Sequence, residues 1–208
     1  MKNMQYKNNI DNNKLVRWAA AGIITDVLYF AAVSMFIATK TDISLTVWEL
    51  MTVVGAFVML MALSCFADGY NIGHEHRTYM LISLSGTLFL TSTAHFTSIG
   101  VVRRLISQGA DIPDYFRIGM FPSLEMTVDY TAWGLFMGCA FLAISLGIVE
   151  ARLKVISMIC AILCFTGFIG SFFLEALWYP APLGYGAGFL VMCIYILVSK
   201  KQSRAMPI

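Results

Sequence analysis

Long apolar runs separated by short polar breaks dominate the chain. A membrane-spanning helix needs about 20 mostly apolar residues, with a range of roughly 17–25. The breaks between the runs hold charged residues, glycine and proline, which is the composition of turns. Six runs are long enough to be predicted as spans: residues 15–38, 46–67, 79–102, 123–148, 154–176 and 183–199.

These runs predict helices rather than strands. A chain in lipid must satisfy its backbone hydrogen bonds internally, so it spans as helices or as a closed barrel. Barrel strands are segments of about ten residues with alternating polarity, and the runs here do not alternate. The sequence therefore predicts an all-α polytopic membrane protein, with six transmembrane helices in one domain over residues 15–199. Residues 1–14 are predicted to be a disordered cytoplasmic tail and residues 200–208 a second cytoplasmic tail.

Composition supports the membrane class. The chain is 59% hydrophobic and 12% charged, whereas soluble domains are about 45–50% apolar and about 25% charged. The net charge of +2 is small and the basic residues form no single stripe, so no nucleic-acid partner is expected. The lipid bilayer is the expected partner.

The distribution of lysine and arginine predicts the orientation, because cytoplasmic loops are enriched in both. Of the 14 basic residues, ten fall on the side that holds both termini and the second and fourth loops. Both termini are therefore predicted to be cytoplasmic. No retention signal is visible, so the cell membrane is the expected location. The other side holds Lys40, Arg103, Arg104 and Arg117.

Ionisable residues inside the predicted spans are the main functional signal. One charge at bilayer depth costs about 2.5–3.5 kcal/mol on insertion scales, so such residues face inward and mark candidate sites. These residues lie within the spans or at their ends: Asp26, Glu49, His95, Glu125, Asp129 and Glu175.

Depth and direction place most of these residues in the outer part of the membrane. At 1.5 Å per residue, His95 lies roughly 10 Å below the outer end of the third span, and Asp129 lies roughly 9 Å below the same surface in the fourth. Glu125 precedes Asp129 by one turn on the same face. Glu49 and Glu175 lie near the outer ends of the second and fifth spans.

These positions predict an outward-facing ligand site centred on His95 and Asp129. Glu125, Glu175 and Glu49 would flank it, and Arg103 would stand at its mouth. An aspartate paired with a histidine suits proton coupling, so the favoured ligand is a small molecule or a proton. Buried acids also fix helix packing through hydrogen bonds, which is the alternative interpretation of the same residues.

Asp26 is also predicted to be a ligand-binding residue; it is the deepest of the acids, near the centre of the first span. No lysine or arginine lies at its depth. It is therefore expected to be either protonated or hydrogen-bonded to a helix hydroxyl.

The chain lacks the residues of several membrane chemistries. No span has a mid-helix lysine for a Schiff base, only His95 could ligate a haem, and no phosphate-binding loop is present. The His74–His76 pair is interpreted as a polar turn rather than a metal site. No cofactor or metal is therefore predicted. The five cysteines all fall in apolar runs and are interpreted as packing residues.

Three functional classes remain open. The favoured one is transport or binding of a small molecule or ion. The others are a non-catalytic membrane partner, such as an assembly, sensor or immunity-type protein, and an enzyme on a lipid-like substrate with His95 as base and Asp129 as its orienter. Gly134 and Gly138 form a GxxxG motif, which marks either a homodimer face or an internal helix contact.

Overall fold

The chain is all-helical over the residues that the computed structural model describes. The described backbone covers residues 2–118 and 120–205, and the described side chains cover residues 13–118 and 120–200; no strand occurs among them. The long helices are α1 (Lys2–Thr39), α2 (Asp42–Gly69), α3 (His74–Thr97), α6 (Met137–Gly147), α7 (Ala151–Gly170) and α9 (Phe189–Ala205). The shorter helical elements are η1 (Ser98–Val102), α4 (Arg103–Ser107), η2 (Asp114–Phe116), α5 (Leu124–Tyr130), η3 (Thr131–Phe136), η4 (Glu175–Trp178), α8 (Pro180–Pro182) and η5 (Leu183–Gly188).

Several elements join end to end into longer helices, and five helices in the described chain are long and apolar enough to cross a membrane. They are Asn13–Thr39, Asp42–Gly69, Leu124–Gly147, Ala151–Gly170 and Glu175–Lys200. The predicted span at 79–102 is not among them. Its helix, α3, is 24 residues long, but its second half contains Thr91, Ser92, Thr93 and His95, which lower its apolar character.

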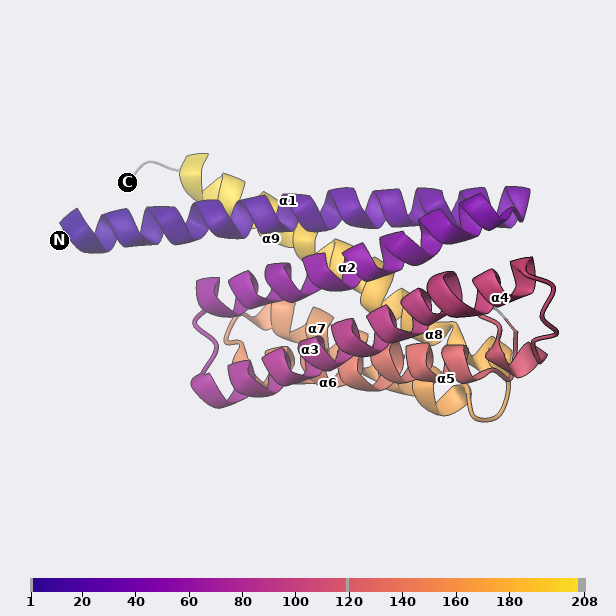
Figure 1. The fold of residues 1–208 in the computed structure, drawn as a ribbon. Helices are drawn as coiled ribbons and strands as arrows, with labels where there is room; N and C mark the ends of the chain where they lie inside the picture. Colours follow the sequence, from indigo (N-terminus) through magenta and orange to yellow (C-terminus); the bar gives the residue numbers. More distant parts are fainter. Residues whose placement is uncertain (1, 119, 206–208) are drawn as a thin grey trace.

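The helices pack as an elongated bundle. α1 lies along α2 and α9, while α3 contacts both α2 and α6, and α6 packs on α7 (Figure 1). The first turns of α1 and the last turns of α9 lie at the same end of the molecule (Figure 1). Two hydroxyl–carbonyl contacts fix the middle of α3: Thr87 Oγ1 donates to the Ser83 carbonyl at 3.2 Å and to the Ala132 carbonyl of η3 at 3.1 Å.

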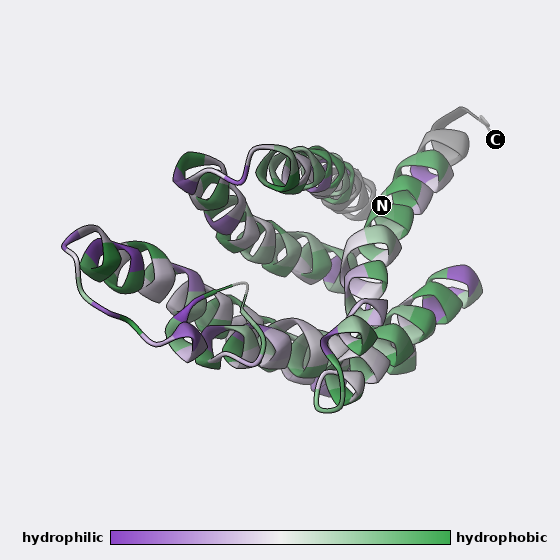
Figure 2. Ribbon diagram, turned by 90° about the vertical axis from the view of Figure 1, so that its right-hand side faces the viewer, coloured by the Kyte–Doolittle hydropathy of each residue, from purple (hydrophilic) through white to green (hydrophobic). Residues whose placement is uncertain are grey.

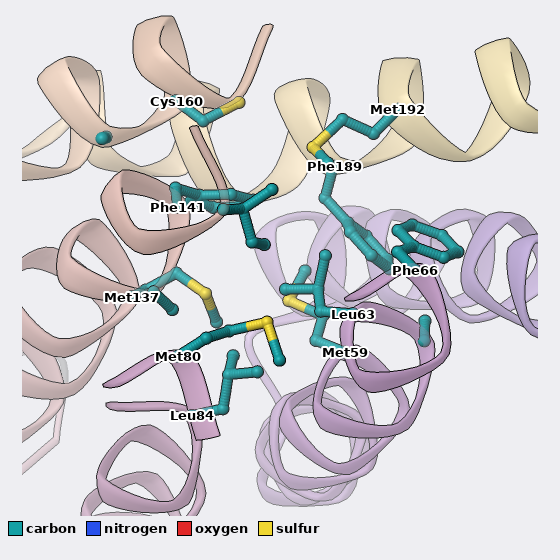
Figure 3. Close-up of a cluster of buried hydrophobic side chains, with 14 of the residues drawn as sticks. Met59, Leu63, Phe66, Met80, Leu84, Met137, Phe141, Cys160, Phe189 and Met192 are labelled. Carbon is teal, nitrogen blue, oxygen red and sulfur yellow. The ribbon is translucent and has the colours of Figure 1, made fainter. Parts of the chain in front are cut away.

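Large apolar side chains fill the centre of the bundle. Figure 3 shows Met59, Leu63 and Phe66 of α2 facing Met80 and Leu84 of α3, with Phe189 of α9 beside them. Phe66, Leu63 and Phe189 are at most 1% exposed. Flexible methionine side chains among leucine and phenylalanine fill the irregular space between crossing helices.

The outer faces of the helices are also apolar, as the green ribbons in Figure 2 show. Phe89 is 70% exposed and Phe173 is 79% exposed. A soluble protein rarely leaves large contiguous apolar surface in water. The exposed faces therefore fit an environment of lipid, and the helices are compatible with a membrane protein. Other exposed apolar residues are Ile24, Val27, Ile37, Ile43, Phe57, Ile82, Val155, Ile162, Phe172 and Val191.

The last inter-helix break lies earlier than the sequence suggests. The predicted fifth span runs to residue 176, but α7 ends at Gly170, and the chain reverses over residues 171–174. Pro180 stands in the first turn of the returning helix, where a missing N–H costs nothing. The reversal is so tight that a Cβ added at Gly170 would lie only 2.6 Å from the Leu177 carbonyl oxygen.

The backbone of α1 begins at Lys2, so helix extends through residues for which the sequence predicts a disordered tail. The side chains of residues 1–12 and 201–208 lie outside the described residues. The division into two tails and one transmembrane domain remains a prediction.

The GxxxG glycines make an internal helix contact. A Cβ at Gly134 would lie 2.6 Å from Phe168 Cβ, and a Cβ at Gly138 would lie 2.8 Å from the Phe165 ring. Both phenylalanines belong to α7. Of the alternatives for this motif, the structure supports close packing of η3 and α6 on α7.

We predict that Gly134→Ala destabilises the protein by about 1–3 kcal/mol, because the added methyl overpacks the contact with Phe168. Gly55→Ala is the matched control: a Cβ there meets nothing within 4 Å, and alanine favours helix by up to about 1 kcal/mol. Thermal unfolding in mild detergent measures both. Equal melting temperatures for the two variants would contradict the close η3–α7 contact.

The α6–α7 turn is fixed by Glu150. Its carboxylate accepts hydrogen bonds from the Leu153 N–H at 2.6 Å and from the Tyr195 hydroxyl of α9 at 2.9 Å. Burial acts to raise the pKa of Glu150, but these hydrogen bonds outweigh it and bring the pKa below the ordinary 4.5. The stabilisation that ionised Glu150 gives to the folded state is therefore fully present above about pH 4.5. It is lost as the pH falls through the pKa that Glu150 has in the folded protein, which lies below 4.5.

We predict that Glu150→Gln lowers the melting temperature at neutral pH and weakens its fall below pH 4.5. The glutamine keeps the shape but not the charge that these hydrogen bonds stabilise. Melting curves between about pH 3 and 7 test this against Glu75→Gln, which removes an exposed carboxylate from α3. The prediction fails if Glu150→Gln and wild type lose stability in parallel on acidification.

Candidate functional site

A histidine between two carboxylates lies at the centre of the candidate site. His95 is 1% exposed; its Nδ1 lies 3.9 Å from Oε1 of Glu49 and its Nε2 lies 3.5 Å from Oδ1 of Asp129. Glu49 is fully buried and Asp129 is 16% exposed. The three residues come from α2, α3 and α5, so this contact joins three helices.

Arg103 completes the cluster from the chain that follows α3. Its guanidinium forms an ion pair with Glu49 Oε2 and donates hydrogen bonds to Thr46 Oγ1 at 2.7 Å and to the Asp42 carbonyl at 3.1 Å. Glu49 is thus the ion-pair partner of Arg103. We call Glu49, His95, Arg103, Asp129 and Glu125 the His95 cluster.

Local backbone structure explains how α3 and the segment that follows it each supply one member of the cluster. The α-helix ends at Thr97 and continues as the π-helix η1, Ser98–Val102. A π-turn adds a residue and rotates the following side chains relative to an unbroken α-helix, and it often occurs at functional sites. The rotation allows His95 and Arg103 to reach the same carboxylate, Glu49.

The start of α5 sets the position of the two remaining acids. Ser123 caps the helix, its hydroxyl accepting a hydrogen bond from the Met126 N–H at 3.1 Å. Asp129 accepts a hydrogen bond from Thr91 Oγ1 of α3 at 3.5 Å. Glu125, one turn earlier, is 4% exposed, and both of its carboxylate oxygens are buried without a hydrogen-bond partner among the described residues.

The two carboxylate contacts of His95 are longer than full hydrogen bonds, and they are ion pairs only when the ring is protonated. An N–H···O hydrogen bond normally spans about 2.7–3.2 Å, and neither ring nitrogen has a partner within hydrogen-bond geometry in the described chain. A neutral imidazole has one N–H to donate, whereas a protonated imidazole has two. Only the protonated ring can therefore donate to Glu49 and Asp129 at the same time.

Aromatic rings of α1 and α2 close the cluster on one side. The Trp48 ring meets the His95 ring edge to face, with centroids 6.4 Å apart and an interplanar angle of 72°. Trp48 Nε1 donates to the Tyr29 hydroxyl at 3.3 Å, and Phe36 stacks on Trp48 with centroids 5.3 Å apart. Through Trp48, these rings connect His95 to α1.

A polar pocket of about 460 Å³, part of it open to the outside, adjoins the cluster through Arg103. Asp42, Arg103 and Arg117 supply its charged groups. The Nε atoms of both arginines are buried without a hydrogen-bond partner in the described part of the chain. The remaining lining residues are Leu45, Ser98, Val102, Ile106 and Ile118.

Two predicted site residues lie elsewhere. Glu175 is exposed at the start of η4, and no ion pair or hydrogen bond of the described residues links it to the His95 cluster. Asp26 is buried in a different pocket, between α1 and α2. The structure thus brings together Glu49, His95, Glu125, Asp129 and Arg103.

Two contributors were not predicted from the sequence. Thr46 precedes Glu49 by three residues, so both lie on one face of α2, and this spacing could have identified it. Tyr29 follows Asp26 by three residues, so the two also lie on one face of α1. Its contact with Trp48 depends on how α1 crosses α2, which no local pattern records.

The cluster does not have the ligand set of a metal centre. Within residues 13–118 and 120–200, no group of three or more His, Cys, Asp or Glu side chains is arranged to hold a metal ion. The five cysteines are all free thiols. Proton transfer and binding of a charged solute are the chemistry that the side chains of the cluster can support.

Comparisons with known protein families, curated proteins and solved structures found no match to this chain. The site is interpreted from its own geometry.

We predict that Glu49→Gln and Arg103→Gln each destabilise the protein by about 3–5 kcal/mol, because each change leaves a buried charge without its partner. The double variant Glu49→Leu/Arg103→Met should lose less than the sum of the two single changes, because both charges are removed. Equilibrium unfolding in mixed micelles measures all three.

The exposed pair Asp114–Arg117 is the control for this cycle. Its side chains are 67% and 40% exposed, so Asp114→Asn should cost at most about 1 kcal/mol. A Glu49→Gln cost as small as that of Asp114→Asn would show that the Glu49–Arg103 pair contributes little.

Proposed function

We propose that this protein crosses the membrane six times, with both termini in the cytoplasm, and exchanges protons for a small cation at an outward-facing site centred on His95. The cell membrane is its proposed location. The observation that carries the proposal is a buried histidine held between carboxylates from two different helices.

The position of α3 supports six crossings. It runs antiparallel to α2 and contacts both α2 and α6 (Figure 1). Thr91 and His95 are buried on the inward face of α3, where polar side chains at membrane depth cost less than on a lipid-facing surface. An even number of crossings also agrees with the shared end of α1 and α9.

Proton binding at His95 changes how the helices are held. The protonated ring can donate to Glu49 of α2 and Asp129 of α5, whereas the neutral ring can donate to one of them. Gain or loss of one proton therefore makes or breaks a bridge across α3. A protein needs such a two-state contact to couple proton binding to the movement of another solute.

The charge of the His95 cluster favours a cationic solute. It holds three carboxyl groups, those of Glu49, Glu125 and Asp129, and one guanidinium, that of Arg103, which pairs with Glu49. With all three carboxyl groups ionised, the cluster is negative whether or not His95 is protonated. An uncompensated negative charge in a low-dielectric site attracts a cation and repels an anion. Glu125 supplies two carboxylate oxygens that no described residue satisfies.

The polar pocket beside Arg103 gives this cluster a route to the outer surface. Arg103 lies between the pocket and Glu49, at the position that the sequence assigns to the mouth of the site. A cation that displaces Arg103 from Glu49 would keep that carboxylate paired. Exchange of one positive charge for another avoids leaving a bare charge in the membrane.

We predict proton release from proteoliposomes when a cation is offered outside. Vesicles containing the pH dye pyranine are loaded at about pH 6 and diluted into sodium chloride or choline chloride at the same pH. Wild-type protein should raise the internal pH with at least one of the two cations. His95→Gln and Asp129→Asn should reduce the initial rate at least about 10-fold, because both remove the bridge.

His74→Gln is the matched control, since His74 is exposed at the start of α3, and it should retain the wild-type rate. Equal rates in wild type and His95→Gln, or no wild-type signal above that of empty vesicles, would contradict the proposal. Folded His95→Gln and Asp129→Asn proteins that differ from wild type in melting temperature alone would instead support a packing role.

A further inference from the structure

A second pocket lies between α1, α2 and the η3 and η5 segments, apart from the residues of the His95 cluster. Its empty space is about 390 Å³, part of it open space at the mouth. We call it the Asp26 pocket. Its lining includes Asp26, Tyr29, Trp133, Tyr185 and Phe189.

Two polar groups in this lining have no partner. Asp26 is 5% exposed and its Oδ2 is buried without a hydrogen-bond partner among the described residues. Trp133 is 3% exposed, and its indole N–H is unpaired in the same way. Most buried polar groups in native proteins are hydrogen-bonded, so an acceptor and a donor left unpaired in one pocket indicate a ligand that can satisfy both.

The surrounding backbone departs from regular α-helix at this pocket. Trp133 belongs to the π-helix η3, and Tyr185 and Gly186 belong to the π-helix η5. π-segments are rare and frequently occur at functional sites. Two of them meeting at one pocket point to a lining shaped for a particular occupant.

The chemistry of the walls selects the class of ligand. A carboxylate favours a cation over an anion or a neutral molecule. A metal ion would need several oxygen or nitrogen ligands, whereas the pocket offers a single carboxylate among aromatic rings. Aromatic faces stabilise organic ammonium groups through cation–π contact, and they also cover an apolar body.

We propose that the Asp26 pocket binds a small organic amine, primary or secondary, whose ammonium group pairs with the Asp26 carboxylate while its apolar body lies among the aromatic rings. A hydrogen-bond acceptor on the ligand would receive the Trp133 N–H. This inference is independent of proton exchange at His95.

Binding of 2-phenylethylammonium to the purified protein in lipid nanodiscs tests the proposal, with 2-phenylethanol as the neutral match and empty nanodiscs as background. Calorimetry measures affinity. Wild type should bind the amine saturably and at least about 10-fold more tightly than the alcohol, the difference expected from one charge-assisted hydrogen bond. Asp26→Asn should remove that preference.

A second variant covers the case in which Asp26→Asn fails to fold. A Cβ at Gly55, on the opposite wall, meets nothing within 4 Å, so Gly55→Leu should fill the pocket without overpacking the bundle and abolish amine binding. His95→Gln should bind the amine as wild type does, which separates this site from the proposed exchange site.

Several results would overturn the proposal. They are no saturable amine binding by wild type, equal affinity for the amine and the alcohol, and unchanged amine affinity in folded Asp26→Asn or Gly55→Leu. Equal affinity for the two compounds would assign the pocket to neutral apolar molecules such as lipid chains.

Discussion

The cost of burying charge between lipid-facing helices is the constraint on which this structure depends. Glu49 is fully buried and His95 nearly so, and neither would be tolerated without a partner of opposite charge. A chain of contacts meets this requirement: Arg103 pairs with Glu49, Glu49 lies next to His95, and His95 lies next to Asp129. Because the four come from α2, α3, α4 and α5, the pairing also fixes how the helices are arranged at that end of the bundle.

This constraint explains features that are otherwise unconnected. The hydroxyl-rich half of α3 lies where it can contact Asp129 and η3, and the shift from α-helix to π-helix at Ser98 lets Arg103 reach the carboxylate that His95 also faces. In the centre of the bundle, methionine, leucine and phenylalanine pack directly against one another (Figure 3). The bundle thus combines an apolar centre with a charge-paired cluster.

Counting residues along the predicted spans was enough to place His95 and Asp129 at one depth, and their side chains meet at 3.5 Å. The same reasoning gave Glu49, Glu125 and Arg103 as neighbours. It could not show that Glu175 lies away from the His95 cluster. The position of Glu175 depends on α7 ending at Gly170, where the returning chain packs against the glycine. Nor could it predict the π-helices or the Asp26 pocket, since both arise from contacts between segments distant in sequence, and hydropathy records only the average character of each segment.

The most direct test of the central claim is the protonation of the His95 ring. Nitrogen-15 NMR of histidine-labelled protein reports whether one or both ring nitrogens carry a proton, and His95→Gln assigns the signal against His74 and His76. The account predicts that His95 changes between the one-proton and two-proton forms as the pH is varied while the protein stays folded, and that Glu49→Gln alters this pattern. A ring that keeps one neutral tautomer at every pH at which the protein is folded, unchanged by Glu49→Gln, would contradict the proton-dependent bridge between α2 and α5.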